Sequence, residues 1–423
     1  MYIAKIEAEV GRIDFDIPES VACLMTPKEY VRSLCFEELS AAHSAAHSYR
    51  LSAKLLNRAL RRAPDKEVKV STLNEHVEAM GRKATACLRR KAGEILETSL
   101  EEYSGDLTDG NIQSQLAELY PEPLSCSGHS DDDPFSEQIK QYNNGKDEHE
   151  QIKRKDLVAA TEPSPENIVY ISIDDVGVQR QKDKRTSDYV KDKKRVENTV
   201  IHVETDGKKH VITAIGMHNA FTLLIAFLIS NDLLGSHRIV CFSDGAQNIR
   251  NCIDLFFSFR QSVVHMLDWY HLEKRMKELL SMSVKGSKDT KNTIRHAIGR
   301  RLWAGNVDEA IDYLENIPKK SIKNQQRLDE AIDYLKRRKP HIPCYALRSL
   351  LGYRNSSNPA EKANDRVVAV RQKHNGMSWS YTGSSSLALI TALEINNELS
   401  TWISTGTIPF NMNSTDHMQG KAA

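Results

Sequence analysis

Two aspartates that each close a short apolar run are the residues best placed to support chemistry. Asp174 follows the β-branched run at residues 168–173, and Asp175 stands next to it. Asp244 follows the apolar run at residues 239–243 and precedes a glycine that turns the chain. Carboxylates at neighbouring strand ends are ligands that Mg²⁺ accepts, and two such ions can stabilise the attacking and leaving oxygens of a phosphoryl transfer.

The elements that must position these aspartates predict a mixed sheet. Apolar runs bounded by turn signals predict five strands and two intervening helices, at residues 168–175, 199–204, 210–216, 238–243 and 262–268 for the strands and 221–234 and 248–257 for the helices. The order β-β-β-α-β-α-β is that of a ribonuclease-H-like sheet, in which the first and fourth strands are neighbours. We therefore expect Asp174 and Asp244 to lie side by side.

The choice between the paired aspartates, and the identity of a third acid, stay open on the residues alone. Asp174 and Asp175 point to opposite faces of a strand, so only one can face a bound ion, and the other would cap the turn. A late helix from residue 358 carries Glu361, with Asp365 one turn further along the same face. Asn358 as N-cap and Pro359 behind it make an ordinary helix start, in which Glu361 would accept a hydrogen bond from the backbone.

Residues 271–357 are helical in character and contain a short repeat. The segment at residues 308–314 recurs, with the same residues, at 329–335. Both copies have the apolar spacing of an amphipathic helix, and two copies are too few for a stacked array. We therefore predict two helices that face one core within an all-helical insertion.

The first hundred residues are also helical in character. A helix is predicted from Ser48 to Arg58 and a second from Ser71, with Ser71 and Asn74 as cap-type residues and a breaker at residues 63–65. Basic side chains flank both helices, which is consistent with a DNA-binding helix-turn-helix, although most such hairpins are simply solvated. Turn-forming residues then predict a linker.

The composition sets broad limits. A chain of 423 residues is long enough for two or three domains, and its net charge of +1 neither supports nor excludes a nucleic-acid partner. Seven cysteines without a CxxC pair indicate reduced thiols in a cytoplasmic protein. The apolar stretch at residues 220–229 is too short to cross a bilayer, so no membrane role is expected.

Several further residues lie near the predicted site in the sequence. Asp268 and His271 lie close to the end of the fifth strand and could position the metal ligands through hydrogen bonds without contacting the metal themselves. Four cationic or aromatic side chains cluster near the C-terminus, and their types suit phosphate contact and base stacking. They are Arg371, Lys373, His374 and Trp379. Cations at a helix end also complement the helix dipole without any ligand.

The order of these motifs resembles that of DDE transposases of bacterial insertion sequences, including the Mutator-like and related groups. The matching text is Ile-Ser-Ile-Asp at Asp174, Phe-Ser-Asp-Gly-Ala at Asp244, Asp-Trp-Tyr-His-Leu from Asp268, Glu361, and Arg-x-Lys-x-x-Gly-Met-x-Trp from Arg371. The resemblance covers roughly residues 167–401.

This resemblance implies a transposase that binds the ends of its element, hydrolyses phosphodiester bonds there and joins the 3′ ends to target DNA. Asp174, Asp244 and Glu361 would be the catalytic acids that hold two Mg²⁺ or Mn²⁺ ions, with Asp175, Asp268, His271 and Asp365 around them. Pairing two DNA ends implies a homo-oligomer, at least a dimer, in the bacterial cytoplasm near the nucleoid. The alternatives are an inactive DNA-binding protein derived from a transposase, or a ribonuclease-H-like nuclease.

The predicted organisation is α/β, with an α-helical region before a ribonuclease-H-like core that is split by the helical insertion. The predicted segments are 1–104 for the N-terminal helices, 105–166 for the linker, 167–270 for the first part of the core, 271–357 for the insertion, 358–404 for the final core helices and 405–423 for a C-terminal tail.

Overall fold

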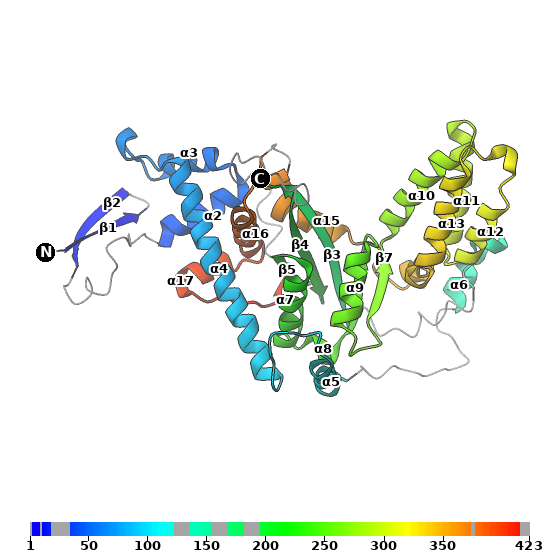
Figure 1. Ribbon diagram of the computed structural model, residues 1–423, viewed down its shortest axis with the longest axis horizontal. Coiled ribbons are helices and arrows are strands. Elements are labelled where there is room, and N and C mark those ends of the chain that lie inside the picture. Colours follow the sequence, from blue (N-terminus) through cyan, green and yellow to red (C-terminus); the bar gives the residue numbers. More distant parts are fainter. Residues whose placement is uncertain are drawn as a thin grey trace, which may run out of the picture.

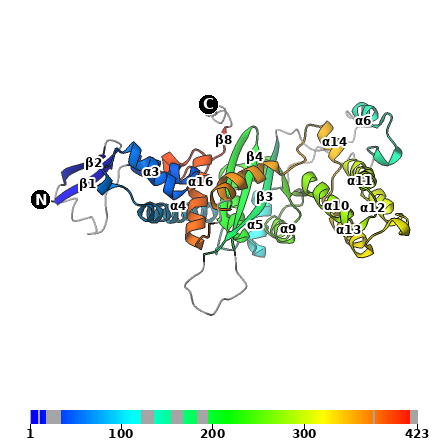
Figure 2. The ribbon, with the colours of Figure 1, turned by 90° about the horizontal axis from the view of Figure 1, so that it is seen from above.

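The computed structural model describes two N-terminal strands as backbone and five further segments with their side chains, except for residues 413 and 414, which are described as backbone. These are residues 2–8 and 11–17, and then residues 34–121, 136–153, 167–181, 195–373 and 377–414. The molecule is elongated, with N-terminal helices at one end, a sheet in the middle and a helical bundle at the other end (Figures 1 and 2). The architecture is mixed α/β, as predicted.

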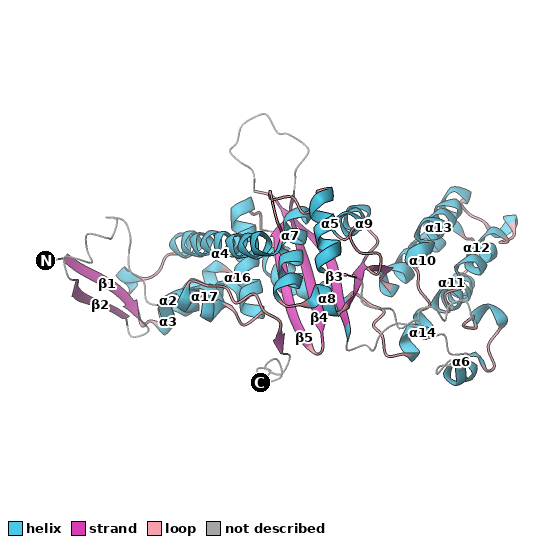
Figure 3. Cartoon of the chain, turned by 90° about the horizontal axis from the view of Figure 1, so that it is seen from below, coloured by secondary structure: helices cyan, strands magenta, loops and turns pink. Residues whose placement is uncertain are grey.

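The central sheet has the strand order β7-β6-β3-β4-β5-β8. Strands β3, β4 and β5 form an antiparallel meander, while β6 runs parallel to β3 and β7 runs parallel to β6. The strands, magenta in Figure 3, are β3 (Ile168–Gln179), β4 (Arg195–Thr205), β5 (Lys208–Ile215), β6 (Arg238–Ser243), β7 (Val264–Leu267) and the two-residue β8 (Asn413–Ser414). The predicted pairing of the first and fourth strands is confirmed, and the order is compatible with a ribonuclease-H-like sheet.

Both faces of the sheet are covered, which explains why its strands are apolar along their length. Ile171 and Ile173 belong to the main core, together with apolar residues of three helices. Tyr170 and Phe242 pack on the opposite face. The three helices are α4 (Val70–Ser99), α7 (Met217–Ser230) and α9 (Gln247–Phe256), and the short α8 (Leu233–Ser236) leads into β6.

The N-terminal part differs from the prediction at two points. It begins with an antiparallel hairpin of β1 (Tyr2–Ala8) and β2 (Gly11–Ile17), not with a helix. The second predicted helix, α4, begins after Lys69 instead of at Ser71. The other elements here are α2 (Leu34–Ala46), α3 (Tyr49–Ala59) and the 3₁₀ turn η1 (Pro64–Lys66). Ser48 does cap α3, because its hydroxyl oxygen accepts a hydrogen bond from the backbone N–H of Leu51 at 3.3 Å.

Part of the predicted linker belongs to the main core, which corrects that prediction. Ile112 and Leu116 are buried in the same cluster as the sheet residues. Gln113 anchors this segment, because its side-chain amide donates to the carbonyl oxygens of Leu107 at 2.6 Å and Phe256 at 3.3 Å. The elements are α5 (Gly110–Leu119), α6 (Ser136–Asn143) and the 3₁₀ turn η2 (Glu148–Glu150).

A series of helices follows β7, and the repeated segment forms two amphipathic helices around one core. Ile311 and Leu314 of the first copy and Ile332 and Leu335 of the second are buried together. The elements are α10 (Trp269–Ser283), α11 (Lys288–Trp303), α12 (Val307–Glu315), η5 (Lys319–Ser321), α13 (Gln325–Arg338), η6 (Lys339–His341) and α14 (Tyr345–Leu350).

The chain returns to the sheet through α15 (Asn358–Asn364), which continues as the π-helix η7 (Asp365–Lys373). Two further helices follow, α16 (Tyr381–Ile395) and α17 (Leu399–Thr405). The start of the predicted tail is packed, since Ile408 and Phe410 are buried in the main core.

No helix in the described part of the chain has the length and apolar character needed to cross a bilayer.

The close packing of α4 on α16 generates a stability prediction. A Cβ atom added at Gly81 would lie 2.2 Å from Cβ of Ser386, so Gly81→Ala must push the two helices apart and should lower the unfolding free energy by about 1–3 kcal/mol. Gly93 lies on the same helix with nothing within 4 Å, so Gly93→Ala should instead raise it by roughly 0.5–1 kcal/mol. Urea denaturation of both variants tests this. Equal effects of the two substitutions would contradict the helix contact.

Candidate functional site

The parallel pairing of β3 with β6 brings Asp174 and Asp244 together. Ser172 is in register with Phe242 at the end of the β3–β6 pairing; Asp174 lies two residues further along β3, and Asp244 directly follows the last residue of β6. Burial raises the pKa of Asp174 to about 6, and the negative charge of Asp244 adds to that rise. Asp244 itself is exposed, and one of its carboxylate oxygens accepts a hydrogen bond from the backbone N–H of Ala246 at 2.7 Å. The prediction that the two acids are neighbours is therefore confirmed.

Asp174 and Asp175 face different partners, as expected of adjacent strand residues. The side-chain amide of Asn364, on α15, donates a hydrogen bond to Asp174. Asp175 accepts hydrogen bonds from the hydroxyl of Thr199 at 2.6 Å and from the side-chain amide of Asn248, on α9, at 3.1 Å. Burial also raises the pKa of Asp175, although these two hydrogen bonds oppose it. Of the pair, Asp174 is the one that faces α15.

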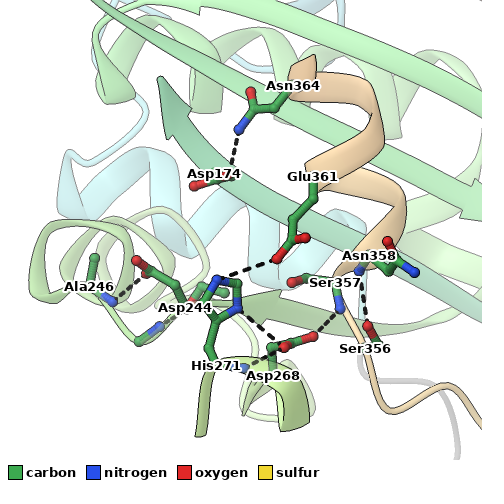
Figure 4. Close-up of polar contacts among 12 residues, drawn as sticks. Asp174, Asp244, Ala246, Asp268, His271, Ser356, Ser357, Asn358, Glu361 and Asn364 are labelled. Carbon is green, nitrogen blue, oxygen red and sulfur yellow. Dashed lines mark hydrogen bonds and ion pairs between the residues drawn. The ribbon is translucent and has the colours of Figure 1, made fainter. Parts of the chain in front are cut away.

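Glu361 points from α15 towards the same region as the two aspartates (Figure 4). One of its carboxylate oxygens lies 3.4 Å from Nε2 of His271. Asp365 begins η7 and is exposed. The residue before the helix is Ser357, so the predicted N-cap, Asn358, is wrong by one position.

Asp268 holds His271 and the start of α15 at once. It is 1% exposed, and its Oδ1 accepts a hydrogen bond from the backbone N–H of His271 at 2.9 Å and lies 3.2 Å from the ring Nδ1. Its other oxygen accepts a hydrogen bond from the backbone N–H of Ser357. Burial alone would raise the pKa of Asp268, but the hydrogen bonds from His271 and Ser357 hold it below the ordinary value.

His271 therefore sits among carboxylates. The hydrogen bond with Asp268 raises the pKa of His271 above its ordinary value against the opposing effect of burial, and the charges of Glu361 and Asp244 add to the rise. A protonated His271 balances part of the negative charge that these acids concentrate.

The donor chemistry of the site suits a hard divalent cation, but the present side-chain positions do not form a complete ligand set. Carboxylate oxygens are the ligands that Mg²⁺ prefers. Within the described residues, no three histidine, cysteine, aspartate or glutamate side chains are gathered closely enough to hold a metal ion. Asp174 and Asp244 supply two candidate ligands, whereas Glu361 is paired with His271.

Two of the four residues predicted to contact DNA are buried, which corrects that prediction. Arg371 is 3% exposed, donates to the backbone carbonyl of Ser44 at 3.0 Å, and lies 4.9 Å from the ring centre of Tyr49. Trp379 is 6% exposed, and its indole N–H donates to the carbonyl of Gln372 at 3.0 Å. Both residues join the C-terminal helices to α2 and α3. Lys373 is exposed, and His374 lies outside the described residues.

Asn364 is a site residue that the sequence reasoning missed. It lies three residues after Glu361, so helical spacing puts both on one face, and that spacing was the available signal. Asparagine carries no charge, so its residue type alone does not indicate a place beside metal ligands.

No family model matches this sequence, and no curated protein matches it. Comparison with solved structures finds a similarity to the Drosophila P element transposase strand transfer complex, at 9% sequence identity and a TM-score of 0.27, over 93% of this chain and 88% of that chain. A TM-score at this level does not establish a shared fold.

The raised pKa of Asp174 gives a pH-dependent stability prediction. Its folded-state pKa of about 6 lies above the ordinary 3.8, so the stabilising contribution is complete below about pH 4 and is lost as the pH rises through 6. Asp174→Asn should therefore be more stable than the unaltered protein at pH 8, by about 2 kcal/mol, and nearly equal at pH 4. The measurement is urea denaturation in EDTA. The exposed control Asp312→Asn should show no such pH dependence, and a gap for Asp174→Asn that is constant with pH would refute the burial argument.

The burial of Arg371 gives a second prediction. Arg371→Ala removes a hydrogen bond and the stacking on two aromatic rings, so it should lower the unfolding free energy by about 2 kcal/mol. The exposed neighbour provides the control, since Lys373→Ala should change stability by less than about 0.5 kcal/mol. Thermal unfolding distinguishes them, and similar melting temperatures would show that Arg371 is not structural.

Proposed function

We propose that this chain is a DDE-type transposase that cuts DNA at the ends of an insertion sequence and joins the 3′ ends to target DNA. The observation that carries the proposal is the placement of Asp174, within β3, beside Asp244, which directly follows the parallel neighbouring strand β6. Glu361, on a helix that follows an all-helical insertion, adds a third acid. The strand order is compatible with the ribonuclease-H-like core that such an enzyme requires.

In this proposal Asp174, Asp244 and Glu361 are the metal ligands, and each has a separate support. Asn364 orients Asp174 through its amide, and the Ala246 N–H orients Asp244. His271 pairs with Glu361 and holds it beside the site. Two Mg²⁺ or Mn²⁺ ions, when bound, would activate the attacking oxygen and stabilise the leaving 3′ oxygen.

The remaining predictions extend the same proposal. The N-terminal helices would bind the terminal repeats, and Lys373 stays a candidate for phosphate contact because it is exposed. A protein that pairs two DNA ends would act as a dimer or larger homo-oligomer, and we expect it to work in the bacterial cytoplasm near the nucleoid.

A second candidate function is a DNA-binding protein that has kept the fold but does not cut. The pairing of Glu361 with His271, which occupies this carboxylate with an imidazole, is the observation that favours it. The two functions differ in one readout, because only the transposase cleaves element-end DNA when a divalent cation is added.

The test is cleavage of a supercoiled plasmid that carries the element ends, with Mg²⁺ or Mn²⁺. Asp244→Asn keeps the side-chain shape but removes its charge, so we expect cleavage to fall by at least about 100-fold, the loss typical when charge stabilisation of a transition state is removed. Asp312→Asn, an exposed aspartate in the insertion, is the matched control and should leave cleavage unchanged.

Undiminished cleavage by Asp244→Asn would remove this residue from the mechanism. DNA binding without cleavage by the unaltered protein, at any divalent cation concentration, would favour the inactive DNA-binding protein.

A further inference from the structure

Asp174, Asp244 and Glu361 together are called the acidic centre here. A cavity of about 290 Å³ lies against α15, and none of these three residues lines it. Asn358, Lys362 and Arg366, spaced four residues apart, line this cavity. Glu361 and Asn364, on the adjoining face of the same helix, reach His271 and Asp174 instead. The helix formed by α15 and the start of η7 therefore contributes side chains to two neighbouring surfaces, one acidic and one basic.

The lining of the cavity is strongly basic. Among its described residues are four lysine or arginine side chains and a single carboxylate, that of Glu204. Arg354 neutralises this carboxylate, because its Nη2 donates to Oε1 of Glu204 at 2.6 Å. The basic residues are Lys209, Arg354, Lys362 and Arg366. Basic side chains thus outnumber acidic ones around a small volume, and Lys362 is exposed.

The floor of the cavity is built from ordered, partly buried groups. The guanidinium of Arg354 lies 5.2 Å from the ring centre of Tyr170, a residue of the same strand as Asp174. His202 also lines the cavity and is 6% exposed. Its Nδ1 lies 3.9 Å from the Glu204 carboxylate and has no hydrogen-bond partner among the described residues. Burial lowers the pKa of His202 to about 4, so the ring is neutral at pH 7.

We propose that this cavity, the α15 basic pocket, binds one backbone phosphate of the nucleic acid that the acidic centre acts on. The inference rests on the proposed function and names a contact for its substrate. A phosphodiester offers anionic oxygens that lysine attracts as a point charge and arginine contacts through its planar fork. The volume is near the lower end of small-ligand sites, about 300–1,000 Å³, which suits one phosphate and its sugar.

The position of the pocket indicates what the contact between Lys362 and a phosphate would do. Lys362 and Glu361 are consecutive residues of α15, so a phosphate held by Lys362 fixes the strand relative to the helix that carries Glu361. The basic pocket would therefore set which phosphodiester of the strand reaches Asp174 and Asp244.

The experiment measures binding in EDTA, so that it does not depend on cleavage. Fluorescence anisotropy with a duplex oligonucleotide of the element end is recorded over a series of KCl concentrations. Lys362→Gln should weaken binding and reduce the slope of log K against log [KCl] by about 1, the value for one lost phosphate contact. Lys362→Arg keeps the charge and should retain the slope. Lys320→Gln, an exposed lysine in the insertion, is the charge-matched control and should also retain it.

A second measurement identifies the source of the phosphate. Inorganic phosphate should raise the melting temperature of the unaltered protein and of Lys320→Gln, but not of Lys362→Gln. If this protection is lost in Lys362→Gln while its DNA affinity and salt dependence stay unchanged, the pocket takes a free phosphate compound, and the assignment to nucleic acid is overturned. Equal DNA binding and equal protection of Lys362→Gln and Lys320→Gln would overturn the pocket altogether.

Failure of the proposed function gives a different result. In the Asp244→Asn background, Lys362→Gln should still reduce the salt slope by about 1, because Asp244 lies outside the basic pocket. If the unaltered protein never cleaves DNA but its DNA binding depends on Lys362, the α15 basic pocket is supported and the transposase function is refuted.

Discussion

The proximity of two like charges, one within β3 and one directly after β6, is the constraint on which the rest of the site depends. Carboxylates this close repel each other, and the half-buried position of Asp174 adds a desolvation cost. The surroundings offset that cost with oriented dipoles and with the imidazole of His271, whose pKa is raised by its hydrogen bond with Asp268. Asn364 and the backbone N–H groups of Asp175 and Ala246 donate to the two acids, and His271 lies close enough to influence both. Carboxylates with shifted pKa values that lie close together are typical of functional sites.

The third acid depends on a different kind of contact. Glu361 reaches the site because α15 begins where Asp268 can accept a hydrogen bond from the Ser357 N–H, and because His271, on α10, pairs with the carboxylate. One buried aspartate thus orients an imidazole and fixes the first turn of a helix. The acidic centre is assembled from the sheet, from α10 and from α15.

The sequence predicted the sheet well because its strands are buried on both faces and end at conspicuous turns, and the strand order then placed Asp174 beside Asp244. It failed where tertiary contacts decide the outcome. Arg371 and Trp379 carry the residue types of a DNA contact, but Tyr49, more than 300 residues away in the chain, covers Arg371. The core role of Ile112 and Leu116 was hidden in a stretch rich in turn residues. The orientation of Asn364 depends on its partner across the site, which spacing suggests but does not determine.

The two ends of the helical insertion are tied together at its base. Asp268 and Ser357 are 89 positions apart yet share a hydrogen bond, and the Trp269 N–H donates to the carbonyl of Asn355 at 3.3 Å. Most of the residues between these ends form a separate core, but His271 near the first end and Arg354 near the second reach back to the acidic centre and to the α15 basic pocket. A shift of the helical bundle at its base would therefore move His271 and change the position in which Glu361 is held.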